Sequence, residues 1–169
     1  NLLALYESRR FNEAEKLAKS MSQEFPNHPF SWKVLGALLQ AVGRYSEAVD
    51  ANQKAVDLSL QDADAYYNLG NTLKALGRLG EAEVSLRQAI ELKPNLAEAY
   101  LNLAKTIKFS PQDEQFGRME KFYRDPMISE SHRCQICFAL AKAFRSRRAS
   151  LALDRALRRR LWHGPTTSS

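Results

Sequence analysis

Similar residues recur every 34 positions between Ala14 and Ile107, and this period restricts the fold more than any other feature of the sequence. The columns are Ala14, Ala48 and Ala82; Trp32, Tyr66 and Tyr100; Leu35, Leu69 and Leu103; Gly36, Gly70 and Ala104; and Leu39, Leu73 and Ile107. Within each unit the apolar residues are three or four positions apart, which is the spacing of one face of an α-helix. The period therefore predicts an all-α fold in which each unit forms two antiparallel helices.

Glycine and capping signals mark where these helices begin and end. Gly43 and Gly77 occur where the first helix of a unit has to stop, and glycine adopts the left-handed conformation of a helix C-terminus without steric cost. Asn95 and Glu98 have the spacing of a capping box, so we expect Asn95 to cap the helix that starts the next unit.

The columns resemble the signature of the tetratricopeptide repeat family, which has an aromatic residue, then Leu-Gly, a further apolar residue, Ala, and a terminal Pro such as Pro94. The resemblance covers residues 1–108. It divides them into the end of one repeat, two complete repeats at 29–62 and 63–96, and the opening helix of a fourth at 97–108. Such a resemblance implies a right-handed superhelix of antiparallel helix pairs, in which the opening helix of each repeat lines a concave surface.

Residues 109–163 depart from the period but keep helical patterns, and we expect them to form C-terminal helices that cap the array. Ser110 followed by Pro111 is typical of a helix start, and Ser129 is a second candidate cap. The later helix is expected to bury one apolar face, made of Cys134, Cys137, Phe138, Ala141 and Phe144. Residues 164–169 are predicted to form a disordered tail.

The same region shows a second resemblance. A tetratricopeptide array followed by Asp125-Pro126 and the segment FALAKAF at 138–144 is similar to the N-terminal region of bacterial proteins that join such repeats to a sulfotransferase-like domain. One hypothesis is therefore that the chain is the substrate-recruiting part of a larger transferase whose catalytic domain lies outside it. From Arg145 the sequence becomes rich in arginine, which fits either a basic closing helix or an altered reading frame.

The net charge of +6 comes from the C-terminal part of the chain. Residues 1–141 contain 17 Lys and Arg against 18 Asp and Glu, a balance of −1, whereas residues 142–169 contain 8 against 1, a balance of +7. A run of cations can bind nucleic acid or an acidic membrane surface, so a basic electrostatic tether is an alternative hypothesis. Only Trp162 accompanies the run and no nucleic-acid-binding motif is present, so we do not expect a nucleic-acid partner.

No constellation of residues suggests catalysis, a cofactor or a metal. His28, His132 and His163 are far apart, and no glycine-rich phosphate loop is present. Cys134 and Cys137 lie near His132, but a structural zinc site needs four ligands, and we expect both thiols to be buried in a helical core. We therefore predict no catalytic residue, cofactor or metal ligand. The low cysteine count and the lack of an apolar run long enough to span a membrane favour a cytoplasmic location.

The helix faces that point away from the core are the candidate binding surface. This second stripe contains Asp64, Asn68, Asn71 and Ala75 in one opening helix, and Glu98, Asn102, Lys105 and Phe109 in the next. Asn68 and Asn102, one period apart, resemble the asparagine ladder in the repeats of O-linked N-acetylglucosamine transferase. That ladder holds an extended peptide by its backbone, and the resemblance implies the same use here. An amide side chain suits this use because it can both donate to and accept from a peptide unit.

These patterns predict a non-enzymatic protein–protein interaction module that binds an extended peptide or a partner helix in its concave groove. The predicted contact residues are Lys33, Asn68, Asn71, Asn102 and Lys105. The alternative is that the asparagines simply face water. A clamp for a peptide carboxylate matches poorly, since Ala37, Glu98 and Asn102 occupy positions where that clamp uses Asn, Lys and Arg. An array end left uncapped would favour a homodimer.

Overall fold

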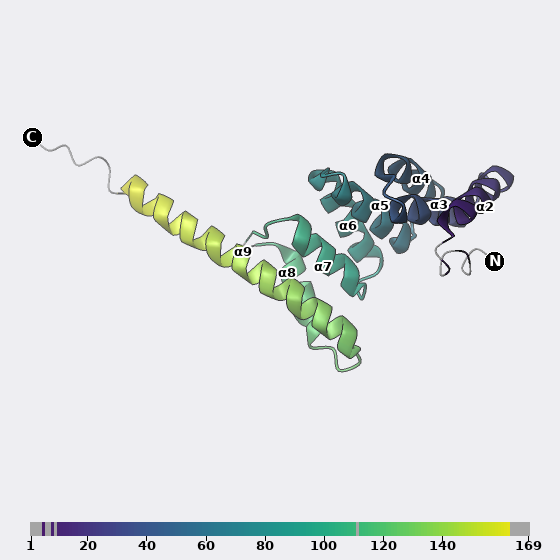
Figure 1. Ribbon diagram of the computed structural model, residues 1–169. Coiled ribbons are helices and arrows are strands. Elements are labelled where there is room, and N and C mark those ends of the chain that lie inside the picture. Colours follow the sequence, from purple (N-terminus) through teal and green to yellow (C-terminus); the bar gives the residue numbers. More distant parts are fainter. Residues whose placement is uncertain (1–4, 6–7, 9, 111, 163–169) are drawn as a thin grey trace, which may run out of the picture.

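Eight helices, labelled α2 to α9, make up most of the described part of the chain, which comprises residues 5, 8, 10–110 and 112–162 of a computed structural model (Figure 1). They are α2 (Phe11–Glu24), α3 (Pro29–Ala41), α4 (Tyr45–Leu58), α5 (Ala63–Ala75), α6 (Leu79–Leu92), α7 (Ala97–Thr106), α8 (Glu114–Tyr123) and α9 (Glu130–Trp162). No strand occurs among these described residues, and the predicted all-α class is confirmed. None of these eight helices combines the length and the apolar character needed to cross a membrane.

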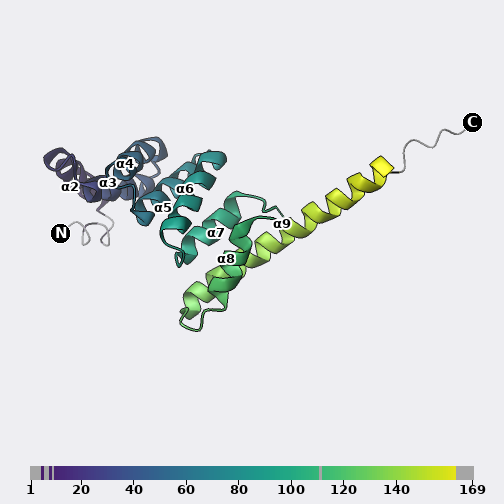
Figure 2. The ribbon, with the colours of Figure 1, turned by 180° about the vertical axis from the view of Figure 1, so that it is seen from behind.

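The helices from α3 to α6 form two pairs that stack on one another. α3 packs along α4 and α5 packs along α6, while α4 contacts α5 and α6 contacts α7. Repetition of this step produces the superhelical stack seen from its two sides in Figures 1 and 2. Gly43 and Gly77 follow α3 and α5 with φ angles of 80° and 77°, which confirms the predicted ends of these helices.

Small side chains let the paired helices approach closely. The fully buried alanines of the closing helices are Ala48, Ala55, Ala82 and Ala89. A Cβ atom added at Gly70 in α5 would lie 2.8 Å from Leu86 Cγ in α6, so a larger residue fits there only if α6 moves or Leu86 changes its position. The repeat columns are therefore contact positions between helices.

The start of α7 differs from the prediction. Asp62 caps α5, because its Oδ1 accepts hydrogen bonds from the N–H groups of Asp64 and Ala65 at 3.0 and 3.1 Å. One period later the N-cap position holds Leu96, and no side chain caps α7. The predicted cap at Asn95 is wrong, because the cap column of these repeats lies one residue further along the chain.

The start of α8 also differs from the prediction, because Asp113 rather than Ser110 is the N-cap. Asp113 Oδ1 accepts from the N–H of Gln115 at 3.1 Å, and Oδ2 accepts from Arg87 Nη2 at 2.6 Å. Burial raises the pKa of Asp113, but the Arg87 guanidinium and the Gln115 N–H outweigh burial and hold this pKa below its usual value. The carboxylate thus starts α8 and ties it to α6, whereas Pro111 lies outside the described residues.

Replacing Asp113 with asparagine is expected to lower the free energy of unfolding by about 1–2 kcal/mol at pH 7. An amide can still cap α8, but it loses the charge-assisted hydrogen bond to Arg87. Because the pKa of the carboxyl is lowered by folding, its stabilisation is present above the usual pKa of about 4 and is lost as the pH falls through the folded value. Urea unfolding at pH 7 and about pH 3 measures both effects, and a wild-type advantage that stays constant with pH would contradict this assignment.

The C-terminal helix α9 lies parallel to α7 and continues past it. His132 Nε2, near the start of α9, is 3.8 Å from Glu98 Oε1, near the start of α7. Ser129 precedes α9 as predicted, and its hydroxyl oxygen accepts the N–H of His132 at 3.2 Å. The helix then runs without a break to Trp162 and extends away from the array (Figure 1). The predicted tail at 164–169 lies outside the described residues.

The buried face of α9 is not the predicted one. The residues that α9 buries in the core shared with α7 and α8 are Ile136, Ala139 and Ala143. The predicted core face is exposed instead, at Cys134, Cys137, Phe138, Ala141 and Phe144. The prediction assumed a repeat-like helix pair, but α9 continues straight and no closing helix of the described chain folds back on it. The expected burial of both thiols is therefore wrong.

Candidate functional site

An open groove of about 550 Å³ crosses the opening helices α3, α5 and α7. The groove is lined by Ala37, Gln40, Ala41, Tyr45, Tyr67, Asn68, Asn71, Lys74, Ala75 and Asn102. Half of these residues belong to α5, which lies between the other two opening helices in the stack. Because successive repeats have the same orientation, the outward stripes of neighbouring opening helices meet along one surface.

The structure brings three of the five predicted contact residues together. Asn68, Asn71 and Asn102 line the groove, whereas Lys33 and Lys105 do not belong to its lining. Lys33 Nζ donates to Asp62 Oδ2 at 2.7 Å, an ion pair that joins α3 to the N-cap of α5. Lys105 is exposed on α7. The central candidates are therefore the asparagines.

The three groove asparagines differ in what their amides contact. Asn102 Oδ1 accepts from Lys74 Nζ at 2.6 Å, and Asn102 Nδ2 donates to the Tyr67 hydroxyl oxygen at 3.2 Å. Asn71 Oδ1 is buried and has no hydrogen-bond partner among the described residues. The side chain of Asn68 likewise has no hydrogen-bond partner in the described part of the chain. Asn102 thus contacts both Lys74 and Tyr67, whereas the amides of Asn68 and Asn71 form no hydrogen bond within the described part of the chain.

One end of the groove is positively charged. Burial lowers the pKa of Lys74, and the neighbouring cations Lys105 on α7 and Lys142 on α9 lower it further. No carboxylate of the described residues forms an ion pair with any of these three lysines. A peptide with an acidic residue near this end would relieve the repulsion among them.

Sequence reasoning missed Lys74, Tyr67 and Gln40 as groove residues. A signal was available for Lys74, which follows Asn71 by three positions and therefore shares its helix face. Gln40 stands one period before Lys74, so its place in the groove follows from the same reasoning. Nothing in the sequence indicated the contact between Tyr67 and Asn102, because that contact depends on the distance between two helices.

The predicted outward stripe of α7 contains one error. Phe109 is only 2% exposed and belongs to the core cluster that contains Met119 and Ile136. The helix ends at Thr106, so the chain has already left the helical face when it reaches Phe109. The side chain turns into the space between α7, α8 and α9 because these helices close the core there.

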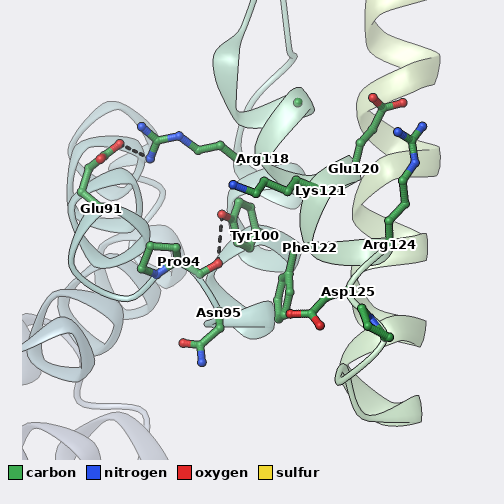
Figure 3. Close-up of a pocket in the computed structure, with 12 residues that line it drawn as sticks. Glu91, Pro94, Asn95, Tyr100, Arg118, Glu120, Lys121, Phe122, Arg124 and Asp125 are labelled. Carbon is green, nitrogen blue, oxygen red and sulfur yellow. Dashed lines mark hydrogen bonds and ion pairs between the residues drawn. The ribbon is translucent and has the colours of Figure 1, made fainter.

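A second cleft, of about 760 Å³, lies between the C-terminal end of α6 and the helices α7 and α8 (Figure 3). Its charged lining residues are Glu91, Arg118, Glu120, Lys121, Arg124 and Asp125. Arg118 pairs with Glu91 at 2.5 Å, and the Tyr100 hydroxyl donates to the carbonyl oxygen of Pro94 at 3.2 Å (Figure 3). Burial raises the pKa of Tyr100 to about 12, so this hydroxyl remains a donor. The charges of the acidic and basic side chains in this cleft balance one another. None of the predicted contact residues lines it.

Two family models match the chain within the helical stack. A tetratricopeptide repeat model matches residues 63–96, and a second model, described as a TPR repeat, matches residues 38–77. The first match coincides with the second complete repeat inferred from the 34-residue period. This repeat, predicted from the columns, is thus recognised independently as a tetratricopeptide repeat.

Solved structures show the same fold at low sequence identity. MamA is 20% identical with a TM-score of 0.60, and the match covers 86% of this chain and 73% of MamA. The first TPR domain of Spaghetti (RPAP3), bound to the HSP90 peptide SRMEEVD, is 23% identical with a TM-score of 0.61. That match covers 62% of this chain and 83% of the RPAP3 domain.

A variant of the O-GlcNAc transferase of Thermobaculum terrenum is 26% identical with a TM-score of 0.61. That match covers 73% of this chain but only 25% of the transferase, so it concerns a limited part of that enzyme. The family models and these structures agree on the architecture. Residues 38–96 of the chain carry tetratricopeptide repeats, and the stacked helix pairs have the fold of a tetratricopeptide superhelix.

Proposed function

We propose that the chain is a non-enzymatic protein-interaction module that holds an extended peptide in the groove. Asn71 supplies the main argument, because its side chain lines the groove while its Oδ1 has no hydrogen-bond partner among the described residues. A buried acceptor left without a partner costs about 1–3 kcal/mol, and a turn of the Asn71 amide toward the groove would let a peptide N–H satisfy it. The fold suits this role, since tetratricopeptide repeats are used for protein–protein interaction.

The peptide would run across α5, with Asn68 and Asn71 on the same helix face. Each amide can accept a peptide N–H or donate to a peptide carbonyl, so the contacts tolerate many peptide sequences. Each such hydrogen bond contributes only about 0.5–1.5 kcal/mol, and the peptide side chains must supply the remaining affinity. Lys74, oriented by Asn102, favours an acidic side chain at the α7 end, while Lys33 and Lys105 would contact only the flanks of the peptide.

The double variant Asn68→Ala/Asn71→Ala is expected to bind peptides about 5- to 150-fold more weakly, the equivalent of two lost hydrogen bonds. The probe is a library of short, unstructured, fluorescein-labelled peptides, scored by fluorescence polarisation at moderate salt. The matched control is Asn12→Ala, which makes the same chemical change at an exposed position of α2 outside the groove. If the double variant kept its helicity and bound the peptides as tightly as the wild type, this result would contradict the groove proposal.

The alternative function is recruitment of substrates for a larger transferase. It is favoured by the similarity to a part of an O-GlcNAc transferase that makes up a quarter of that enzyme. The groove would act in the same way, but its peptide would be a substrate. The parent reading frame decides between the two, since the transferase hypothesis requires that it continue into a nucleotide-sugar-binding or nucleotide-sulfate-binding domain.

A further inference from the structure

An apolar seam runs along the outer side of α9. Its residues are Cys134, Cys137, Ala141, Phe144 and Leu151, with Phe138 beside them, and all six are exposed. Phe138 and Phe144 are 66% and 57% exposed, and apolar side chains that form a continuous exposed patch mark an interaction surface. The steps along the seam alternate between three and four residues up to Phe144, which is the heptad spacing of a surface that packs on another helix.

Equivalent positions in the earlier repeats are covered by a closing helix. Phe138 stands two periods after Gly70 and three after Gly36. The face at Gly36 packs on Asn52 of α4, and the face at Gly70 packs on Leu86 of α6. No closing helix follows α9 in the described chain. The seam therefore has the residues of a helix–helix contact, but no second helix covers it.

The same line of α9 becomes cationic beyond Phe144. Arg148 occupies the next heptad position of the seam, and Arg145 lies beside it. Both are exposed, and neither forms an ion pair with a described residue. The only acidic residues between Glu130 and Trp162 are Glu130 itself and Asp154, against nine Lys and Arg.

The positive charge of α9 favours one kind of partner helix over another. A second copy of the chain would bring another strongly basic α9, so the two helices would repel one another, and in a parallel pairing Arg148 would face its own counterpart. A helix with carboxylates opposite Arg145 and Arg148 would instead gain attraction at the position where a second copy is repelled. Because the apolar residues of the seam have heptad spacing, the partner helix must also present a heptad-spaced apolar stripe.

We propose that the seam of α9 docks an acidic amphipathic helix of another protein, which takes the place of the missing closing helix. The apolar stripe of that helix would cover Cys137, Ala141 and Phe144, and its Asp or Glu residues would pair with Arg145 and Arg148. This site lies on a different surface from the peptide groove and does not depend on the groove being occupied.

The two cysteines of the chain report directly on this seam, because both lie on it and the chain has no others. The experiment measures the rate of alkylation of Cys134 and Cys137 by N-ethylmaleimide in the full chain. The probe is a synthetic amphipathic helix with leucines at the seam positions and glutamates beside them. The control peptide has the same leucines but lysines in place of the glutamates.

The acidic peptide, at about ten times its Kd, is expected to slow alkylation about tenfold, while the lysine peptide leaves the rate unchanged. The double variant Arg145→Glu/Arg148→Glu is expected to reverse this preference, and circular dichroism checks that it remains helical. Equal protection by both peptides, or none by the acidic peptide, would overturn the proposal. Protection by vesicles of anionic lipid in place of the peptide, or by raised concentration of the chain alone, would also overturn it in favour of a membrane or a second copy.

Discussion

Replacing Leu86 with alanine is expected to lower the free energy of unfolding by about 2–5 kcal/mol. Leu86 is completely buried in the core cluster that extends from α6 through α7 to α9. Its side chain also lies against Gly70 of α5, where the two helices approach one another closely. Truncation removes packed methyl groups and leaves a cavity, and close-packed helices relax only partly into such a space. Urea unfolding followed by far-ultraviolet circular dichroism measures the loss.

Val84→Ala provides the matched control in the same helix. Val84 is 70% exposed, so removing its methyl groups is expected to change the free energy of unfolding by no more than about 0.5 kcal/mol. If both variants lost the same stability, the cost would come from α6 itself rather than from the buried contact. The assignment of Leu86 to the core would then be contradicted.

Gly70→Ala is expected to destabilise the fold by about 1–3 kcal/mol, although alanine is the better helix former. The added Cβ would lie 2.8 Å from Leu86 Cγ and 3.3 Å from the backbone carbonyl oxygen of Ala82. One of these groups has to move, and both belong to the packed face of α6. The same unfolding measurement gives the magnitude.

Two further variants separate steric overlap from helix propensity. Gly117→Ala makes the identical change in α8, where nothing lies within 4 Å of the added Cβ, and it is expected to stabilise the protein by about 0.5–1 kcal/mol. In the double variant Gly70→Ala/Leu86→Ala the overlap with Leu86 disappears. Its cost should therefore be smaller than the sum of the two single costs, by about 0.5–3 kcal/mol. If the cost of the double variant equalled the sum of the two single costs, the side chains at positions 70 and 86 would not overlap sterically.

The helix pairs and their ends were predictable because each depends on contacts between neighbours in sequence. The columns at Gly36 and Gly70 mark where a closing helix lies against its opening helix, and Gly43 and Gly77 mark the turns between them. The N-terminal caps were less predictable. Several polar residues precede α7 and α8, and the choice of Asp113 depends on an ion pair with Arg87 in another helix.

The groove was predictable as a surface but not as a set of contacts. A helical period brings Asn68 and Asn71 to one face whatever surrounds them. Whether an amide is free depends on groups from other helices, as at Asn102, whose amide contacts Lys74 and Tyr67 of α5. The positive charge around Lys74 likewise combines residues of α5, α7 and α9, far apart in the sequence.

The sequence by itself determined that this chain forms stacked helix pairs, because a repeat array is built from short-range contacts that recur with the period of the sequence. Only the tertiary structure decided what happens after the period ends. The apolar pattern of α9 is compatible with burial of either of two faces, and the helix that lies nearest determines which one is covered. Ile136 and Ala139 turn to α7, and the face that resembles a repeat column remains open at Phe138.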